Sequence, residues 1–197
     1  IAERLKREYG IVFIFTNPSV AFRIHERVSP DKTKKTPDKK MVYSAAMMPE
    51  FHDIGSIEEP WAKAEIITPL RFLGAITVLI NEKGGVLLDS RALAGDRLRL
   101  LFEIPLREVV VDFYDFVKSV SQGYASLSYE FFGYRAGDLV RLDVRVAGER
   151  VPSFAEIAPR DAAERILRSR LERLKNLLPR EQFAIALQGE MNGRIIA

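Results

Sequence analysis

Hydrophobic positions along this chain change their spacing several times, and each spacing predicts an element. Residues 61–67 alternate between the two faces of an extended strand, with Ala62, Ala64 and Ile66 on one side. A proline opens the next segment, 69–81, in which apolar residues recur every three or four positions. The pattern therefore predicts a strand followed by an amphipathic helix.

The same two spacings of apolar residues, strand-like and helix-like, occur again after this helix. Further strands are predicted at 86–89, 98–102, 124–132 and as a final pair around 133–137. Helical spacing predicts one continuous helix from Pro105 to about Ser119. The order β-α-β-β-α-β is that of a ferredoxin-like domain, in which two helices cover one face of a four-stranded sheet. Residues 58–146 are assigned to this unit.

The flanking segments have other patterns. Residues 1–25 predict a helix, two short strands and a turn, which is typical of the end of a small α+β domain. Residues 26–57 are rich in lysine and predict a basic linker. Residues 147–197 predict a long helix at 161–178, with Leu171 in its apolar stripe, and then short strands. The fold class is therefore α+β throughout.

Composition narrows the class of protein. The chain has 197 residues, 47% of them hydrophobic and 29% charged, which suits a globular protein with a sizeable core. Its net charge is +3 and its sequence pI is about 9.2, a weak preference for an anionic partner. No cysteine is present, which excludes disulfides and thiolate chemistry, and no apolar run is long enough to span a membrane.

Motifs for catalysis are missing from the sequence. No GxxxxGK[ST] phosphate loop occurs, and His25 and His52 lack the paired spacing of a zinc site. The serines have no histidine or lysine in a recognisable nucleophilic motif. We therefore predict no catalytic, cofactor or metal site within these residues.

Basic, polar and aromatic residues around one turn and on the last unit are the candidates for binding. Such side chains contact RNA phosphates and hydroxyls and recognise shape more than sequence. A solvated surface explains each of them equally well when it is taken singly. The candidates are Lys118, Ser121, Gln122, Tyr124, Arg135, Arg160, Arg165, Arg168 and Arg194.

The run SVSQGYASLSYEFFGYRAGDLVRLDV at 119–144 resembles the LepA family, also called elongation factor 4, of ribosome-associated translational GTPases. Other segments resemble the same family. They are IAERLKREYG near the start, EEPWAKAEIITPLRFLGAI at 58–76 and LPREQFAIALQGEMNGRIIA at 178–197.

This resemblance implies that 1–25 ends the family's domain III, that 58–146 is its domain V equivalent, and that 147–197 begins its C-terminal domain. It implies ribosomal RNA and the tRNA acceptor arm as partners, rather than DNA. GTP and magnesium would bind in a G domain preceding Ile1. A monomer in the cytoplasm, with peripheral association at the inner face of the membrane, is expected.

Two other functions remain open at this point. Ferredoxin-like units often bind metabolites, so a small-molecule sensor is one alternative, and a purely structural module without RNA contact is the other. A closed apolar pocket with convergent polar groups would favour the sensor.

Overall fold

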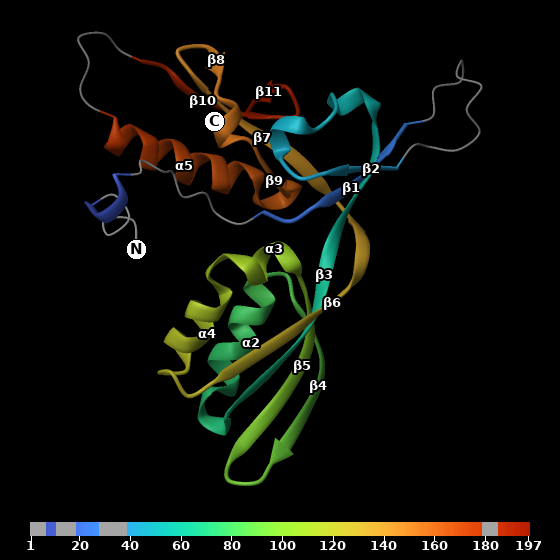
Figure 1. Ribbon diagram of the computed structural model, residues 1–197, viewed down its shortest axis with the longest axis vertical. Coiled ribbons are helices and arrows are strands. Elements are labelled where there is room, and N and C mark those ends of the chain that lie inside the picture. The colour runs from blue at the N-terminus through green and yellow to red at the C-terminus, as the bar shows by residue number, and fades with distance from the viewer. Residues whose placement is uncertain (1–6, 11–18, 28–38, 179–184) are drawn as a thin grey trace.

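The computed structural model describes residues 7–10, 19–27, 39–178 and 185–197. Two units lie one above the other and are joined by a long two-stranded ribbon (Figure 1). We call described residues 60–137 the ferredoxin-like unit, and described residues on either side of them the composite unit. The expected strand at 11–15, residues 28–38 of the expected basic linker and the start of the strand expected from Phe183 lie outside the described residues.

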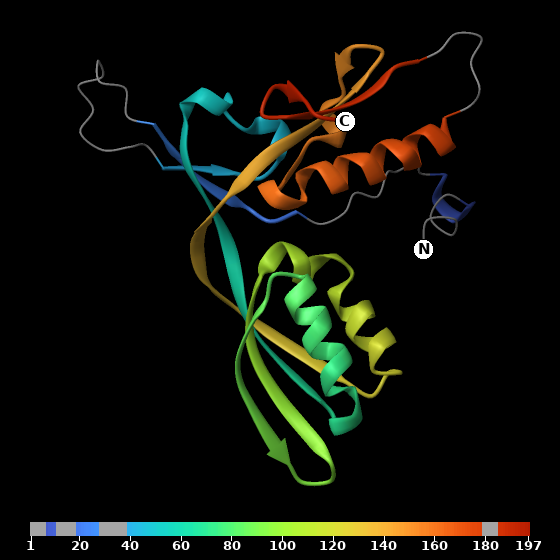
Figure 2. The ribbon, with the colours of Figure 1, turned by 180° about the vertical axis from the view of Figure 1, so that it is seen from behind.

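The ferredoxin-like unit has the predicted order of elements. Its strands are β3 (Ile54–Pro69), β4 (Val86–Leu93), β5 (Arg97–Pro105) and β6 (Ser126–Gly137). They pair antiparallel in the order β4-β5-β3-β6. Helices α2 (Leu73–Glu82) and α4 (Tyr114–Val120) cover one face of this sheet (Figure 2). The ferredoxin-like fold is therefore confirmed.

The alternation read from the sequence gives this unit its core. Ala62, Ala64 and Ile66 of β3 are buried beside Phe102 of β5 and Ile76 of α2. Helix α2 follows a single 3-10 turn, η3 (Leu70–Phe72), for which Pro69 is the N-cap. Strand β3 is much longer than predicted, because its first residues belong to the composite unit.

The predicted single helix from Pro105 to Ser119 is wrong, because the chain breaks in the middle. One turn, α3 (Leu106–Glu108), leads into a distorted segment, η4 (Val109–Phe113), and then into α4. Val111 leaves helical geometry and Asp112 has φ +51°. Three consecutive β-branched valines disfavour a regular helix. Around the break, Val109 and Phe113 pack in the ferredoxin-like core, whereas Val110 packs against the composite unit.

The strand pair expected around 133–137 is also wrong, since 126–137 form one strand. Strand β6 runs beside β3 from Ser126, opposite Ile67, to Gly137, opposite Ile57. Its pairing shifts at Phe132 and Gly133, and Gly133 has φ +153°, which only glycine adopts without strain. A bulge here bends the ribbon where it leaves the ferredoxin-like unit.

The composite unit begins with a small antiparallel layer. Strand β1 (Phe22–Glu26) lies between β2 (Lys39–Val42) and the first part of β3. Two 3-10 turns, η1 (Ala45–Met47) and η2 (Phe51–Asp53), connect β2 to β3. Residues 39–57, which were expected in the basic linker, are therefore folded, because apolar side chains among them pack into a core. The core of this layer includes Phe22, Ile24 and Val42, with Leu139 and Ile157 from farther along the chain. Segments from both ends of the chain therefore build this unit.

A second sheet completes the composite unit. Strand β7 (Leu139–Val146) is its centre, and it pairs with β8 (Glu149–Arg150), β9 (Glu156–Pro159) and β10 (Leu187–Met191). Strand β11 (Arg194–Ile195) pairs with β10, and the 3-10 turns η5 (Pro152–Phe154) and η6 (Arg160–Ala162) flank β9. The expected unit 58–146 extends past the end of the ferredoxin-like sheet. The boundary between the two sheets falls at Asp138, because β7 belongs to the second sheet.

Helix α5 (Ala163–Leu177) covers one face of the second sheet, as the apolar stripe predicted. Ala163 and Leu167 are fully buried, whereas Leu171, expected in the core, is half-buried at its margin. Gly189 of β10 lies directly under Leu167, and a Cβ there would come within 3.0 Å of it. The close approach of helix and strand therefore requires glycine at 189.

Candidate nucleic-acid interface

The turn at 121–124 connects α4 to β6 and carries three of the predicted binding residues, with a fourth, Lys118, beside it. Ser121 is fully buried, and its hydroxyl donates to the Val117 carbonyl at 2.7 Å and accepts from the Ala125 amide at 3.1 Å. This corrects its assignment to RNA, because the hydroxyl is used inside the turn. Gln122 is exposed with φ +53°, and Gly123 has φ +83°, as the predicted turn requires.

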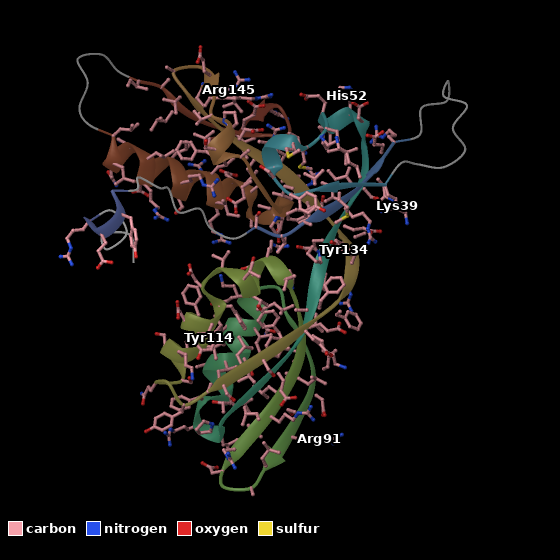
Figure 3. All side chains as sticks on the ribbon, in the orientation of Figure 1. Lys39, His52, Arg91, Tyr114, Tyr134 and Arg145 are labelled. Atoms are coloured by element: carbon pink, nitrogen blue, oxygen red, sulfur yellow. The ribbon has the colours of Figure 1, made fainter. Side chains whose placement is uncertain are left out.

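Lys118 ties the turn to the helix. Its Nζ donates to the Ala125 carbonyl at 2.7 Å and to the Gly123 carbonyl at 3.3 Å. The same nitrogen lies 5.4 Å from the ring centre of Tyr114, which Figure 3 labels on α4. Two of its three donors are therefore occupied within the protein, although the side chain remains half-exposed.

Tyr124 joins a small aromatic group that the sequence did not single out. Tyr124 is 63% exposed and its ring stacks on Phe72, with the centroids 6.2 Å apart. The Arg71 guanidinium lies 4.8 Å from the Phe72 ring centre and 5.0 Å from that of Tyr124. Arg71 has no sequence signal of its own, because only the fold brings residues 71 and 124 together. We call Arg71, Gln122 and Tyr124 the tip cluster.

Arg135 does not belong to the tip cluster. It lies nine residues along β6 from Ser126, about 30 Å in an extended strand. Its guanidinium pairs with Glu103 at 2.5 Å and covers the Trp61 ring at 4.6 Å. These contacts hold Arg135 on the sheet, where its charge is already balanced.

Helix α5 and its neighbours carry the remaining candidates. Arg160 pairs with Asp138 at 2.9 Å, and Arg168 pairs with Glu164 one turn away at 2.7 Å. Arg165 on α5 and Arg194 on β11 are exposed and make no ion pair with any described residue. Two further exposed cations of α5, Arg173 and Lys175, were missed and are equally unpaired within the described part of the chain. We call Arg165, Arg173 and Lys175 the α5 cluster.

The other face of the second sheet is ionic. Glu190 is fully buried and is bound by Arg150 and by Arg145, whose Nε lies 2.6 Å from its carboxylate. Burial opposes ionisation of Glu190, but the hydrogen bonds from Arg150 and Arg145 outweigh burial and lower its pKa. Figure 3 labels Arg145 on this sheet. These arginines stabilise the sheet and are not available as free cations.

A shallow cleft borders this network. It is lined by residues in and just before η2, by residues of the second sheet and by its β10–β11 turn, among them Glu50, Arg141, Asp143, Arg150 and Asn192. Two arginines and two carboxylates line the cleft. It is therefore a charged cleft and not the apolar pocket that a small-molecule sensor requires.

Neither a metal site nor a membrane span is found in the described residues. No three histidine or carboxylate side chains of that part gather closely enough to hold a metal ion. None of its helices combines the length and the hydrophobicity needed to cross a bilayer.

Comparison with known proteins adds to this geometry. Residues 56–145 match the family described as elongation factor G C-terminus. A protein named elongation factor 4 from Prochlorococcus marinus strain MIT 9301 is 42% identical over 201 residues, covering 100% of this chain. Its counterpart from strain MIT 9515 is 41% identical over 199 residues. The resemblance to the LepA family is confirmed.

The likeness to LepA proteins covers only part of their length. This chain spans 31% of each of these relatives. A solved structure from Thermus thermophilus is similar over 41% of this chain and 12% of its own, with 21% identity and a TM-score of 0.39, which is too distant to bear on function. The elongation factor G match begins within β3 and ends within β7, so it includes the whole ferredoxin-like unit.

Proposed function

We propose that this chain is a non-catalytic, ribosome-binding part of a LepA-type translational GTPase. The observation that carries this proposal is the α5 cluster, in which three exposed cations lack acidic partners among the described residues. Unpaired cations on one helix are suited to the phosphates of RNA. The tRNA acceptor arm is the proposed partner of the α5 cluster, and ribosomal RNA that of the tip cluster.

GTP and magnesium, which the family implies, would bind outside these 197 residues. A guanine nucleotide with a fluorescent label should therefore show no saturable binding to this chain at micromolar concentrations. The protein is proposed to act as a monomer in the cytoplasm. The elongation factor 4 relatives support a translation-factor parent, and the nucleotide, magnesium and monomer statements belong to the proposal alone.

Cosedimentation with purified ribosomes that carry bound tRNA, at two salt concentrations, tests the RNA contacts. The double variant Arg165→Glu and Arg173→Glu should lose most pelleting, and the remaining binding should depend less on salt because fewer counterions are released. The matched control is Arg91→Glu with Arg97→Glu, which makes the same charge change on exposed strands of the ferredoxin-like unit. Equal pelleting of both variants and the parent chain would refute the proposal.

The tip cluster is tested in the same assay. Arg71→Glu with Gln122→Glu should reduce pelleting independently of the α5 variant, since the two clusters lie on different units. Lys118 is left unchanged in this design, because its bonds to Gly123 and Ala125 hold the turn.

A further inference from the structure

The ribbon between the two units narrows to two strands at one point. Glu58 is the last residue of β3 with a partner in the β1 layer that precedes the ferredoxin-like unit, and Trp61 is the first with a partner in β5. Between them, Glu59 and Pro60 pair with β6 alone. The bulge at Phe132 and Gly133 lies next to this step. We call Glu59 and Pro60, with their β6 partners, the waist.

A two-stranded ribbon bends more easily than a wider sheet, so something else must hold the units at one angle. The segment that does so is α3 and the start of η4. Leu106 packs against both the ferredoxin-like core and the core of the composite unit. Val110, the residue before the break in the helix, packs against the composite core.

Arg107 adds an ionic contact at the same place. Its guanidinium pairs with the carboxylate of Glu59, which is 5% exposed, and also lies 3.3 Å from Glu108. Burial lowers the pKa of Arg107, and the negative charges of Glu108 and of Asp161 act against that effect. Asp161 belongs to η6 in the composite unit, so Arg107 interacts with charges on both sides of the waist.

We propose that residues 106–110 are a clasp and that the waist is a hinge. With Arg107 bound to Glu59, the two units keep one relative orientation. When that pair is released, the ferredoxin-like unit swings about Glu59 and Pro60, while each core stays intact. The inference goes beyond the proposed function and does not depend on it, because the orientation is a property of the chain alone.

The absence of cysteine from the whole sequence makes a direct test simple. Spin labels on Arg91→Cys in β4 and Glu149→Cys in β8 report the distance between the units, since both sites are exposed and lie on different units. Distances are measured by double electron–electron resonance in the labelled chain, with and without Arg107→Met.

The labelled parent should give one narrow distance distribution, and Arg107→Met should broaden or shift it. The matched control is Arg99→Met, which removes an arginine paired with Glu65 at 2.6 Å inside the ferredoxin-like unit and should leave the distribution unchanged. Arg107→Lys should restore most of the parent distribution, because a cation remains opposite Glu59.

Leaving Glu59 unpaired could unfold the protein, so a second variant removes both charges together. The double change Glu59→Gln with Arg107→Gln avoids a buried uncompensated charge. It should also broaden the distribution while circular dichroism stays native. The inference is overturned if a folded variant of either kind keeps the parent distribution, or if the control broadens it equally.

Discussion

The two sheets of this molecule stabilise their second faces in opposite ways. The ferredoxin-like sheet covers one face with α2 and α4 and leaves the other to water, where ion pairs such as Glu65 with Arg99 are partly exposed. The second sheet is covered by α5 on one side and buries Asp143 and Glu190 on the other. Charged side chains therefore lie on the surface of the ferredoxin-like sheet, whereas charged side chains of the second sheet are buried.

This difference predicts which of the two sheets loses more stability when a charged side chain is removed. A solvent-exposed ion pair contributes about 0–1 kcal/mol, whereas a buried carboxylate held by arginines cannot be removed without leaving charge uncompensated. The ferredoxin-like unit should tolerate charge changes that the second sheet does not.

Glu190→Ala is expected to give the largest loss of stability. Removing this carboxylate takes a buried partner from Arg145 and Arg150 and should cost about 3–5 kcal/mol in free energy of unfolding. Glu65→Ala, which removes the partner of Arg99 from the open face, should cost about 1 kcal/mol or less. Urea denaturation of the two variants measures both values, and equal losses would erase the contrast between the sheets.

Leu167→Ala should come next, at about 2–5 kcal/mol, because this side chain is fully buried between α5 and Gly189. Leu171→Ala should cost clearly less, since Leu171 lies at the margin of the same core. Thermal unfolding of the pair ranks them, and a larger loss for Leu171 would mean that the helix faces the sheet differently.

Ser121→Ala should cost about 1 kcal/mol, because it removes two hydrogen bonds inside the α4–β6 turn. The neighbouring Gln122→Ala should change stability by less than about 0.5 kcal/mol, as expected for an exposed side chain. Differential scanning calorimetry resolves the two, and a neutral Ser121→Ala would show that the hydroxyl does not hold the turn.

Acid should destabilise the second sheet, whereas the stability of this sheet should not change near neutral pH. The folded-state pKa of Glu190 is lowered, so its contribution is fully present above its unfolded value of about 4.3 and is lost as pH falls through the folded value. Amide exchange followed through this range should show β10 losing protection before β5. The same loss of protection in Glu190→Gln would show that another group is responsible.

Periodic segments were predictable from sequence, and most of the ferredoxin-like order follows from them. The alternation at 61–67 and the stripe at 69–81 depend on local spacing, so they survive in the fold. The break at Val111 had a local signal, three successive valines. The prediction of one continuous helix gave more weight to the helical spacing than to these valines. The assignment of β7 to the second sheet had none, because its partners lie up to about fifty residues away along the chain.

Candidate binding residues were less predictable than elements. Sequence identifies which residues are basic, but it does not say which of them are already paired. Arg135 and Arg168 proved to have acidic partners, while Arg165 and Arg194 have none among the described residues. Arg71 became a candidate through a contact with Tyr124, fifty-three positions away along the chain.

The central place of β7 has a consequence for how the protein is made. β7 pairs at once with β8 and soon with β9, but its neighbour β10 comes from residues 187–191. Until the ribosome has synthesised those residues, β7 lacks one neighbour and Arg145 lacks its carboxylate partner, Glu190. The nascent chain therefore exposes an unpaired strand edge, which is when chaperones would be needed most.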